Sequence, residues 1–212
     1  MIVTIDGPAA SGKGTLARRI AAHYKLPHLD TGLLYRAVAA HLLEQKRSLD
    51  DAAAAAKAAG ELELDRLDRG RLSGAALGEA ASRVAAIPEV RAALLKLQQD
   101  FSRRPGGAVL DGRDTGTVIA PQAEAKIFVT ASPEVRARRR LQDFAERGER
   151  VPYEAVLADI KKRDARDAGR SIAPLQAAPD AVLLDTTELD IEAAFRAALS
   201  IVEAVRAGRG RS

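Results

Sequence analysis

The chain of 212 residues has no cysteine, which excludes disulfide bonds, thiolate zinc sites and cysteine nucleophiles. Three scattered histidines (His23, His28 and His41) do not indicate a histidine metal centre. Tryptophan is absent and aromatic residues make up 3%, so there are few side chains on which nucleic-acid bases could stack. No apolar run approaches the roughly 18 residues that a membrane-spanning helix needs. We therefore expect a protein that binds neither nucleic acid nor a membrane.

The charged residues leave a small basic excess, with 33 lysines and arginines against 29 acidic residues. Arginine is spread along the chain, and this distribution suits small phosphorylated ligands as well as it suits RNA. The segment MIVTIDG runs directly into a strand pattern, without the basic and then apolar segments of a signal peptide. We expect a cytoplasmic protein, and the lack of a hydrophobic seam predicts a monomer.

Short apolar runs alternate with helical patterns along most of the chain. The runs predict strands at residues 2–5, 108–110, 126–129 and 181–184, with another short strand ending at Leu29. Helices are predicted at residues 13–24, 32–43 and 191–207, and across 133–170 with a break near 148–152. This alternation is typical of an α/β fold in which helices cover both faces of a parallel sheet.

Residues 49–88 interrupt that rhythm. The sequence DDAAAAAKAAG predicts a helix, and ELELDRLDRGRLSG alternates polar and apolar residues around a glycine, which predicts a small hairpin. We interpret this stretch as an inserted subdomain that returns to the core through a helix at 80–101. The terminal AGRGRS is expected to fray.

The stretch TIDGPAASGKGT has the spacing of a phosphate-binding loop. Gly7 and Gly12-Lys13 are separated by four residues, after a predicted strand and before a predicted helix. Such a loop points backbone N–H groups at phosphate oxygens, and a lysine supplies a charge for the outer phosphates. Gly14 and Thr15 follow, in place of the Ser or Thr that usually contacts Mg²⁺ directly. The alternative is a plain strand–helix turn with a solvated lysine; the motif alone leaves ATPases, GTPases and small kinases open.

Two further segments place polar residues at predicted strand ends. LDTGLLYR puts Asp30 or Thr31 in position to cap a helix. In VLDGRDTGT an apolar strand ends at Asp111, so Arg113 and Asp114 are expected at the carboxyl edge of the sheet, where α/β folds bind ligands. Asp111 is a candidate to hold Mg²⁺ through water. The alternative is a turn with a surface ion pair.

Charged helical segments give weaker signals. KKRDARDAGR places Arg163, Asp167 and Arg170 on one narrow stripe, able to bind phosphate and sugar oxygens. Spacing alone favours the alternative, ion pairs on a solvated helix. The run RARRR at 136–140 has the same alternative. Ser82 and Arg91 flank a proline and by themselves say little.

Together, these segments resemble bacterial cytidylate kinase. The resemblance extends in order over nearly the whole chain, through TIDGPAASGKGT, LDTGLLYR, ASRVAAIPEVR, DGRDTGTVIAP, KIFVTAS and KKRDARDAGRSIAPL. It implies a P-loop kinase fold with a central five-stranded parallel sheet in a single domain (1–212), a nucleotide-binding insert (about 49–88) and a short lid (about 146–156). It also implies transfer of the γ-phosphoryl group of ATP to CMP or dCMP.

The resemblance assigns roles to the matching residues. ATP would be bound by Gly7, Pro8, Ala9, Ala10, Ser11, Gly12, Lys13, Gly14, Thr15 and Arg139. Lys13, Asp111, Arg113 and Arg170 would act in catalysis. Arg36, Arg113 and Arg170 would clamp the CMP phosphate, Ser82, Arg91 and Asp114 would read the cytosine ring, and Thr31, Arg163 and Asp167 would complete the CMP site, with the last two at the ribose. Mg²⁺ would enter with ATP and have no direct protein ligand.

The chemistry of cytosine agrees with this assignment, because a carboxylate accepts from its exocyclic amine where uracil presents an acceptor. The insert is shorter than in many members of the family, which leaves CMP affinity and the choice between ribose and deoxyribose open. The alternatives are a P-loop kinase for another monophosphate or small acceptor, a nucleotide sensor without catalysis, and an RNA-binding protein.

Overall fold

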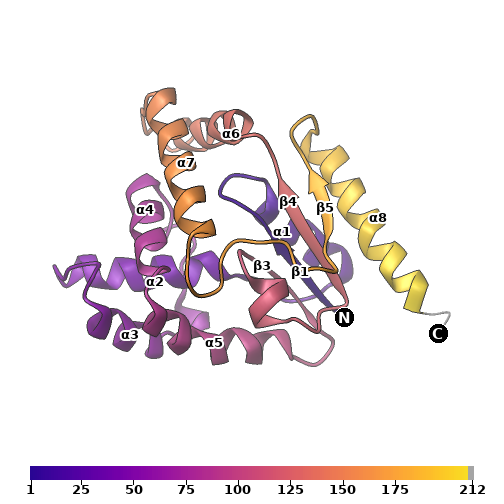
Figure 1. The fold of residues 1–212 in the computed structure, drawn as a ribbon, viewed down its shortest axis with the longest axis horizontal. Helices are drawn as coiled ribbons and strands as arrows, with labels where there is room; N and C mark the ends of the chain where they lie inside the picture. Colours follow the sequence, from indigo (N-terminus) through magenta and orange to yellow (C-terminus); the bar gives the residue numbers. More distant parts are fainter. Residues whose placement is uncertain (210–212) are drawn as a thin grey trace.

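Short apolar segments form one parallel sheet in the computed structural model, which describes residues 1–209 (Figure 1). The strands are β1 (Ile2–Asp6), β2 (His28–Asp30), β3 (Ala108–Gly112), β4 (Ala125–Thr130) and β5 (Val182–Asp185). Their order across the sheet is β2-β3-β1-β4-β5. The predicted α/β fold and its strands are confirmed, each to within one or two residues.

Helices cover both faces of this sheet, as predicted (Figure 1). They are α1 (Lys13–Tyr24), α2 (Thr31–Glu44), α3 (Ala52–Gly60), α4 (Ala75–Val84), α5 (Pro88–Ser102), α6 (Pro133–Ala145), α7 (Tyr153–Ala168) and α8 (Ile191–Arg209). Val3 and Ile5 of β1 pack with α1 and α8, whereas Leu110 of β3 packs on the other face with α2 and α5. Side chains on a strand alternate between faces, so β3 contributes Val109 to one core and Leu110 to the other.

The carboxyl edge of the sheet is where the chain leaves β1 and β3. These two strands are neighbours, and the register pairs Asp6 with Gly112. The loop after β1 leads into α1, and the segment after β3 forms a π-helical turn, Thr115–Ile119. Two different loops therefore begin side by side, which is the usual setting for a binding site in this class of fold.

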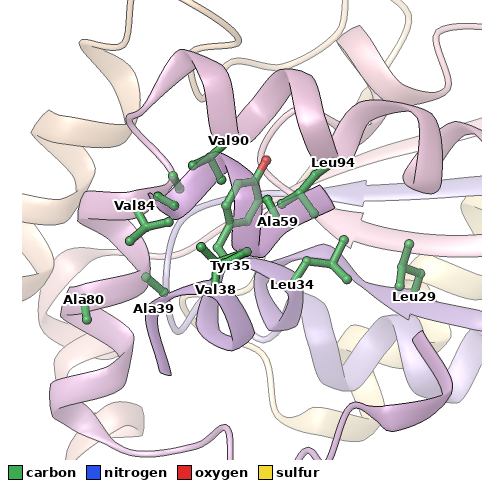
Figure 2. Packing of buried hydrophobic residues seen from close by; sticks show 14 of the residues in the cluster. Leu29, Leu34, Tyr35, Val38, Ala39, Ala59, Ala80, Val84, Val90 and Leu94 are labelled. Carbon is green, nitrogen blue, oxygen red and sulfur yellow. The ribbon is translucent and has the colours of Figure 1, made fainter. Parts of the chain in front are cut away.

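The inserted stretch belongs to one of the two cores. Figure 2 shows Ala59 of α3 and Val84 of α4 packed around Tyr35 and Val38 of α2, with Leu94 of α5. The hairpin predicted within residues 61–74 is wrong: this part contains a 3-10 turn, Leu64–Arg66, and further turns. Its leucines pack separately against the surrounding helices, and an isolated two-stranded hairpin has little stability to set against those contacts.

The helix predicted at 80–101 is two helices, because α4 ends at Val84 and α5 starts with Pro88 in its first turn. Proline lacks the N–H that a continuous helix would need at this position. The predicted break near 148–152 is confirmed between α6 and α7. Residues 207–209 of the tail expected to fray continue α8, and 210–212 lie outside the described residues. Within residues 1–209, no helix combines the length and apolar character needed to cross a bilayer.

Candidate functional site

The phosphate loop connects β1 to α1 through backbone conformations that require glycine. A Cβ atom on Gly7 would lie 2.0 Å from the carbonyl oxygen of Val129, so no side chain fits there. Gly12 has φ +90 and stands directly before α1, whose N-terminus receives no side-chain cap. The first N–H groups of α1 are therefore free to donate to an anion, as the motif predicts.

Lys13 lies where the phosphate loop meets arginines from other segments. Its Nζ donates to the carbonyl of Pro8 at 3.3 Å. Burial, reinforced by the positive charge of Arg113, lowers the pKa of Lys13 to about 7. A phosphate group bound among these positive charges would favour the charged lysine and raise its pKa again.

Asp111 stands beside this loop at the end of β3. A Cβ atom on Gly14 would lie 3.5 Å from its Oδ2, and its Oδ1 is 2.7 Å from Nε2 of His28. Burial would raise the pKa of the Asp111 carboxyl, but the bond with His28 and the charge of Lys13 hold it below the usual value. Asp111 is therefore a carboxylate with one oxygen free beside the phosphate loop.

The capping prediction for α2 is wrong. Asp30 occupies the N-cap position, but its side chain makes no capping hydrogen bond. The Thr31 hydroxyl instead donates to the carbonyl oxygen of Asp111 at 2.9 Å. A Cβ on Gly112 would lie 2.4 Å from this hydroxyl, so the glycine is needed for the contact. A hydrogen bond between α2 and β3 has replaced the local cap.

Arg91 and Asp114 come from distant parts of the chain and form a buried ion pair through Nη2 and Oδ2. Arg91 also donates from Nη1 to the carbonyl of Ala85 at 3.2 Å, and its guanidinium lies 5.5 Å from the Tyr35 ring centroid. The N–H groups of Arg91, which donate hydrogen bonds, therefore lie beside the Asp114 carboxylate, which accepts them. The alternative of a surface ion pair at the turn after β3 is excluded, because both side chains are buried.

Asp167 is the centre of an arginine cluster. It accepts from Nε of Arg113 at 2.8 Å, from Nη2 of Arg170, and from the Ser82 hydroxyl at 3.5 Å. Burial would raise the pKa of Asp167, yet the charges of Arg113 and Arg170 hold it below the usual value. Because Arg163 and Asp167 are buried, the solvated-helix alternative is wrong.

This cluster carries more positive than negative charge. Burial and the neighbouring Arg113 lower the pKa of Arg163 to about 10. Nε of Arg163 and Nε of Arg170 are buried without a hydrogen-bond partner among residues 1–209. Burial and the charge of Arg113 also lower the pKa of Arg36, although Asp30 opposes this effect. Buried N–H groups without a partner are costly, and the positive charges outnumber the negative ones, so this group is suited to an anion.

The run at 136–140 contains side chains with different roles. Arg136 is buried and forms a two-bond ion pair with Asp164 at 3.0 and 2.6 Å, so it joins α6 to α7. Arg139 donates to the hydroxyl of Thr186 at 3.0 Å and to its carbonyl at 2.6 Å. The same hydroxyl donates to the Ser11 carbonyl at 3.1 Å, which connects Arg139 to the phosphate loop.

One cavity of about 1360 Å³ unites these groups. Predicted residues that line it are Ala9, Ala10, Ser11, Gly12, Lys13, Gly14, Thr15, Thr31, Arg36, Ser82, Arg91, Asp111, Arg113, Asp114, Arg139, Arg163, Asp167 and Arg170. Gly7 and Pro8 are the predicted residues that do not line it; they shape the loop from behind. Residues 1–209 contain no group of three or more His, Asp or Glu side chains that could hold a metal ion.

Sequence reasoning missed several residues around this cavity. Asp6 accepts from the backbone N–H of Thr115 and of Gly116, at 2.9 and 2.8 Å, and so fixes the turn that follows Asp114. Burial raises the pKa of Asp6 to about 6 despite these bonds. Asp6 could have been suspected from its place directly before the phosphate loop. His28 and Thr186 carried no signal, because their roles depend on partners far along the chain.

Comparison with known proteins identifies the family of this chain. The family model described as cytidylate kinase matches residues 3–204. A cytidylate kinase of Xanthobacter autotrophicus is 66% identical over 209 residues, covering 99% of this chain and all of its own. One from Rhodopseudomonas palustris is 60% identical over 211 residues, covering all of both chains. A gluconokinase structure from Sinorhizobium meliloti shares the fold alone, with a TM-score of 0.51, 17% identity and coverage of 100% and 97%. The chain belongs to the cytidylate kinase family.

Proposed function

We propose that this protein transfers the γ-phosphoryl group of ATP to CMP or dCMP, giving ADP and CDP or dCDP. One observation carries the assignment beyond family membership: a single cavity has the phosphate loop on one side and the buried Arg91–Asp114 pair on the other. The arginine cluster lies in the same cavity and supplies the positive charge that two phosphorylated substrates need.

On the donor side, the N–H groups of the phosphate loop would bind the ATP phosphates, and Lys13 would stabilise the migrating group. Arg139 would contact ATP from α6. Mg²⁺ entering with ATP would neutralise phosphate charge, and the free oxygen of Asp111 beside Gly14 suits an outer carboxylate that holds it through water. These roles need no covalent intermediate, because the transfer depends on position and charge.

On the acceptor side, Arg36, Arg113 and Arg170 would hold the CMP phosphate. Asp114 would accept from the cytosine amine, Arg91 would donate to its acceptor edge, and Ser82 would complete the base site. Thr31 would lie near the acceptor phosphate. Arg163 and Asp167 would face the ribose, with Asp167 already oriented by two arginines.

We also propose that residues 49–88 act as the acceptor-binding insert and that 146–156 act as a lid. Their closure would keep water from the γ-phosphate. We further propose that the protein works as a cytoplasmic monomer with small nucleotides as its partners. Size-exclusion chromatography with light scattering tests the monomer.

The reaction is tested by ADP release with Mg-ATP and, separately, CMP, dCMP, UMP, AMP or no acceptor. We expect strong turnover with CMP or dCMP and little with UMP. Turnover with a different monophosphate would keep the mechanism and reassign the base-reading residues. Folded protein that binds ATP but shows no acceptor-dependent turnover would contradict the kinase and indicate a nucleotide sensor.

A further inference from the structure

The loop between α3 and α4 carries three arginines, at 66, 69 and 71, that differ in where they lie. Arg66 pairs with Glu63 and Arg71 with Glu44, and both side chains are about 80% exposed, at 80% and 79%. Arg69 is 45% exposed and lines the main cavity. One arginine of this loop therefore lines the cavity, and two are exposed to solvent.

The loop has its own anchors, which keep Arg69 at the cavity. Leu72 is buried against Leu33 and Ala37 of α2. The Asp68 carboxylate accepts from the Gly70 N–H at 2.8 Å, closing a tight turn around position 69. A long side chain at the tip of an anchored turn can move its charged end while its backbone stays in place.

The guanidinium of Arg69 lies on the acceptor side of the cavity. Its Nη1 is 3.4 Å from Oδ2 of Asp30, the residue between β2 and α2. Thr31 and Arg36 follow on α2, and both line the cavity. The charge of Arg69 also helps to lower the pKa of Asp111, after the larger effects of His28 and Lys13. It helps to lower the pKa of Arg36 as well, after the larger effects of burial and Arg113.

We infer that Arg69 is a further acceptor-binding residue, which leaves Asp30 to contact the phosphate of the incoming nucleoside monophosphate. A phosphate dianion offers more charge and more acceptor oxygens than a single carboxylate, and guanidinium binds it in two-bond geometry. The short insert thus contributes the positive charge of Arg69 to the site of the acceptor phosphate, in addition to the residues at the carboxyl edge of the sheet. This inference rests on the proposed function, because the acceptor is taken to be CMP.

The test compares Arg69→Ala with Arg71→Ala, a matched loss of one arginine from the same loop. We expect Arg69→Ala to raise KM for CMP about three- to tenfold, since the contact is charged but half exposed, and to leave KM for ATP within about twofold. Arg71→Ala should match the unaltered protein. Equal KM values for CMP in both variants would overturn the inference.

Asp30→Asn distinguishes two roles of Arg69: binding of the substrate phosphate, and an ion pair with Asp30 that only holds the insert in place. If Arg69 only ties the insert to Asp30, either substitution breaks the tie and both raise KM for CMP alike, which would overturn the inference. If Arg69 binds phosphate, Asp30→Asn frees the guanidinium for substrate and KM for CMP stays within about twofold. Calorimetric CMP affinity without ATP gives the same comparison independently of turnover. Binding without phosphorylation would contradict the proposed function and still decide the role of Arg69.

Discussion

The cavity has a donor half, around the phosphate loop, and an acceptor half, around the arginine cluster and the Arg91–Asp114 pair. The two halves present different kinds of chemical group. On the donor side, the phosphate loop offers mainly backbone groups. Gly7 and Gly12 shape this loop, the N-terminus of α1 has no side-chain cap, and Lys13 adds a positive charge. On the acceptor side, buried ion pairs connect side chains from segments as far apart as Arg91 and Asp114, or Arg113 and Asp167. A main-chain site tolerates variation in side chains, whereas a side-chain network depends on every member.

The donor half is tested most severely at Lys13, the cation of the phosphate loop. Lys13→Ala should lower kcat/KM at least a hundredfold, because it removes a charge that acts on the migrating phosphoryl group. Turnover with CMP measures the effect, and circular dichroism checks that the protein is folded. Lys57→Ala, at an exposed position of α3, is the control and should be unaffected. A Lys13→Ala variant with near-normal turnover would remove Lys13 from catalysis.

The acceptor half is tested at its buried base-reading pair. Asp114→Asn should lower the CMP/UMP ratio of kcat/KM about ten- to a hundredfold, since an amide can no longer serve only as an acceptor. ATP affinity, measured calorimetrically, should change little. The variant should also lose stability, because Arg91 is left buried without its counter-charge. Unchanged selectivity would contradict the role of Asp114 in base reading.

The two halves should also differ in proton uptake: we expect ATP binding at the donor half to be coupled to protonation of Lys13. With a pKa of about 7, Lys13 in the free protein is protonated below pH 7 and loses its proton above it. Bound phosphates favour the protonated form, so ATP affinity should fall by up to about tenfold per pH unit above pH 7. Calorimetry between pH 7 and 9 measures this fall. Lys13→Ala should bind ATP weakly with no such slope, and a slope equal to that of the unaltered protein would assign the proton elsewhere.

The smallest effect is expected where the insert touches α7. Glu79 of α4 accepts from both terminal nitrogens of Arg166, at 3.0 and 2.7 Å. The pair is partly exposed, so Glu79→Ala should cost less than about 1 kcal/mol of stability. KM for CMP should rise about two- to threefold, and KM for ATP should not change. Glu61→Ala, at an exposed position, is the control; identical KM values in both variants would show that the pair does not support the acceptor half.

The same division explains what the sequence could predict. The strand, the glycine spacing and the helix at 13–24 are contiguous, so α1 was predicted to the residue and β1 to within one residue. The acceptor residues could be named only through a resemblance, because spacing alone favoured a solvated helix for Arg163 and Asp167. Their burial is decided by α4 and the turn after β3, which no local pattern describes.

Errors arose where tertiary contacts outweighed a local preference. Thr31 could cap α2, but its hydroxyl bonds to β3 instead. The leucines of 61–74 alternate like a hairpin, yet they pack on α2 and its neighbours. The run 136–140 is compatible with a solvated helix, but Arg136 is the buried partner of Asp164. In each case the deciding partner lies elsewhere in the sequence.

The register that pairs Asp6 with Gly112 has a consequence for protein engineering. The phosphate loop after β1 and the segment with Arg113 and Asp114 after β3 begin on adjacent strands, which lie about 4.8 Å apart. A designer who wishes to change the accepted nucleotide can therefore replace side chains such as Asp114 or Ser82 without altering the distance between the two substrates. Moving β3 itself would change that distance for every acceptor. The sheet therefore fixes the distance between the two substrates, whereas substitution of the side chains can change nucleotide specificity.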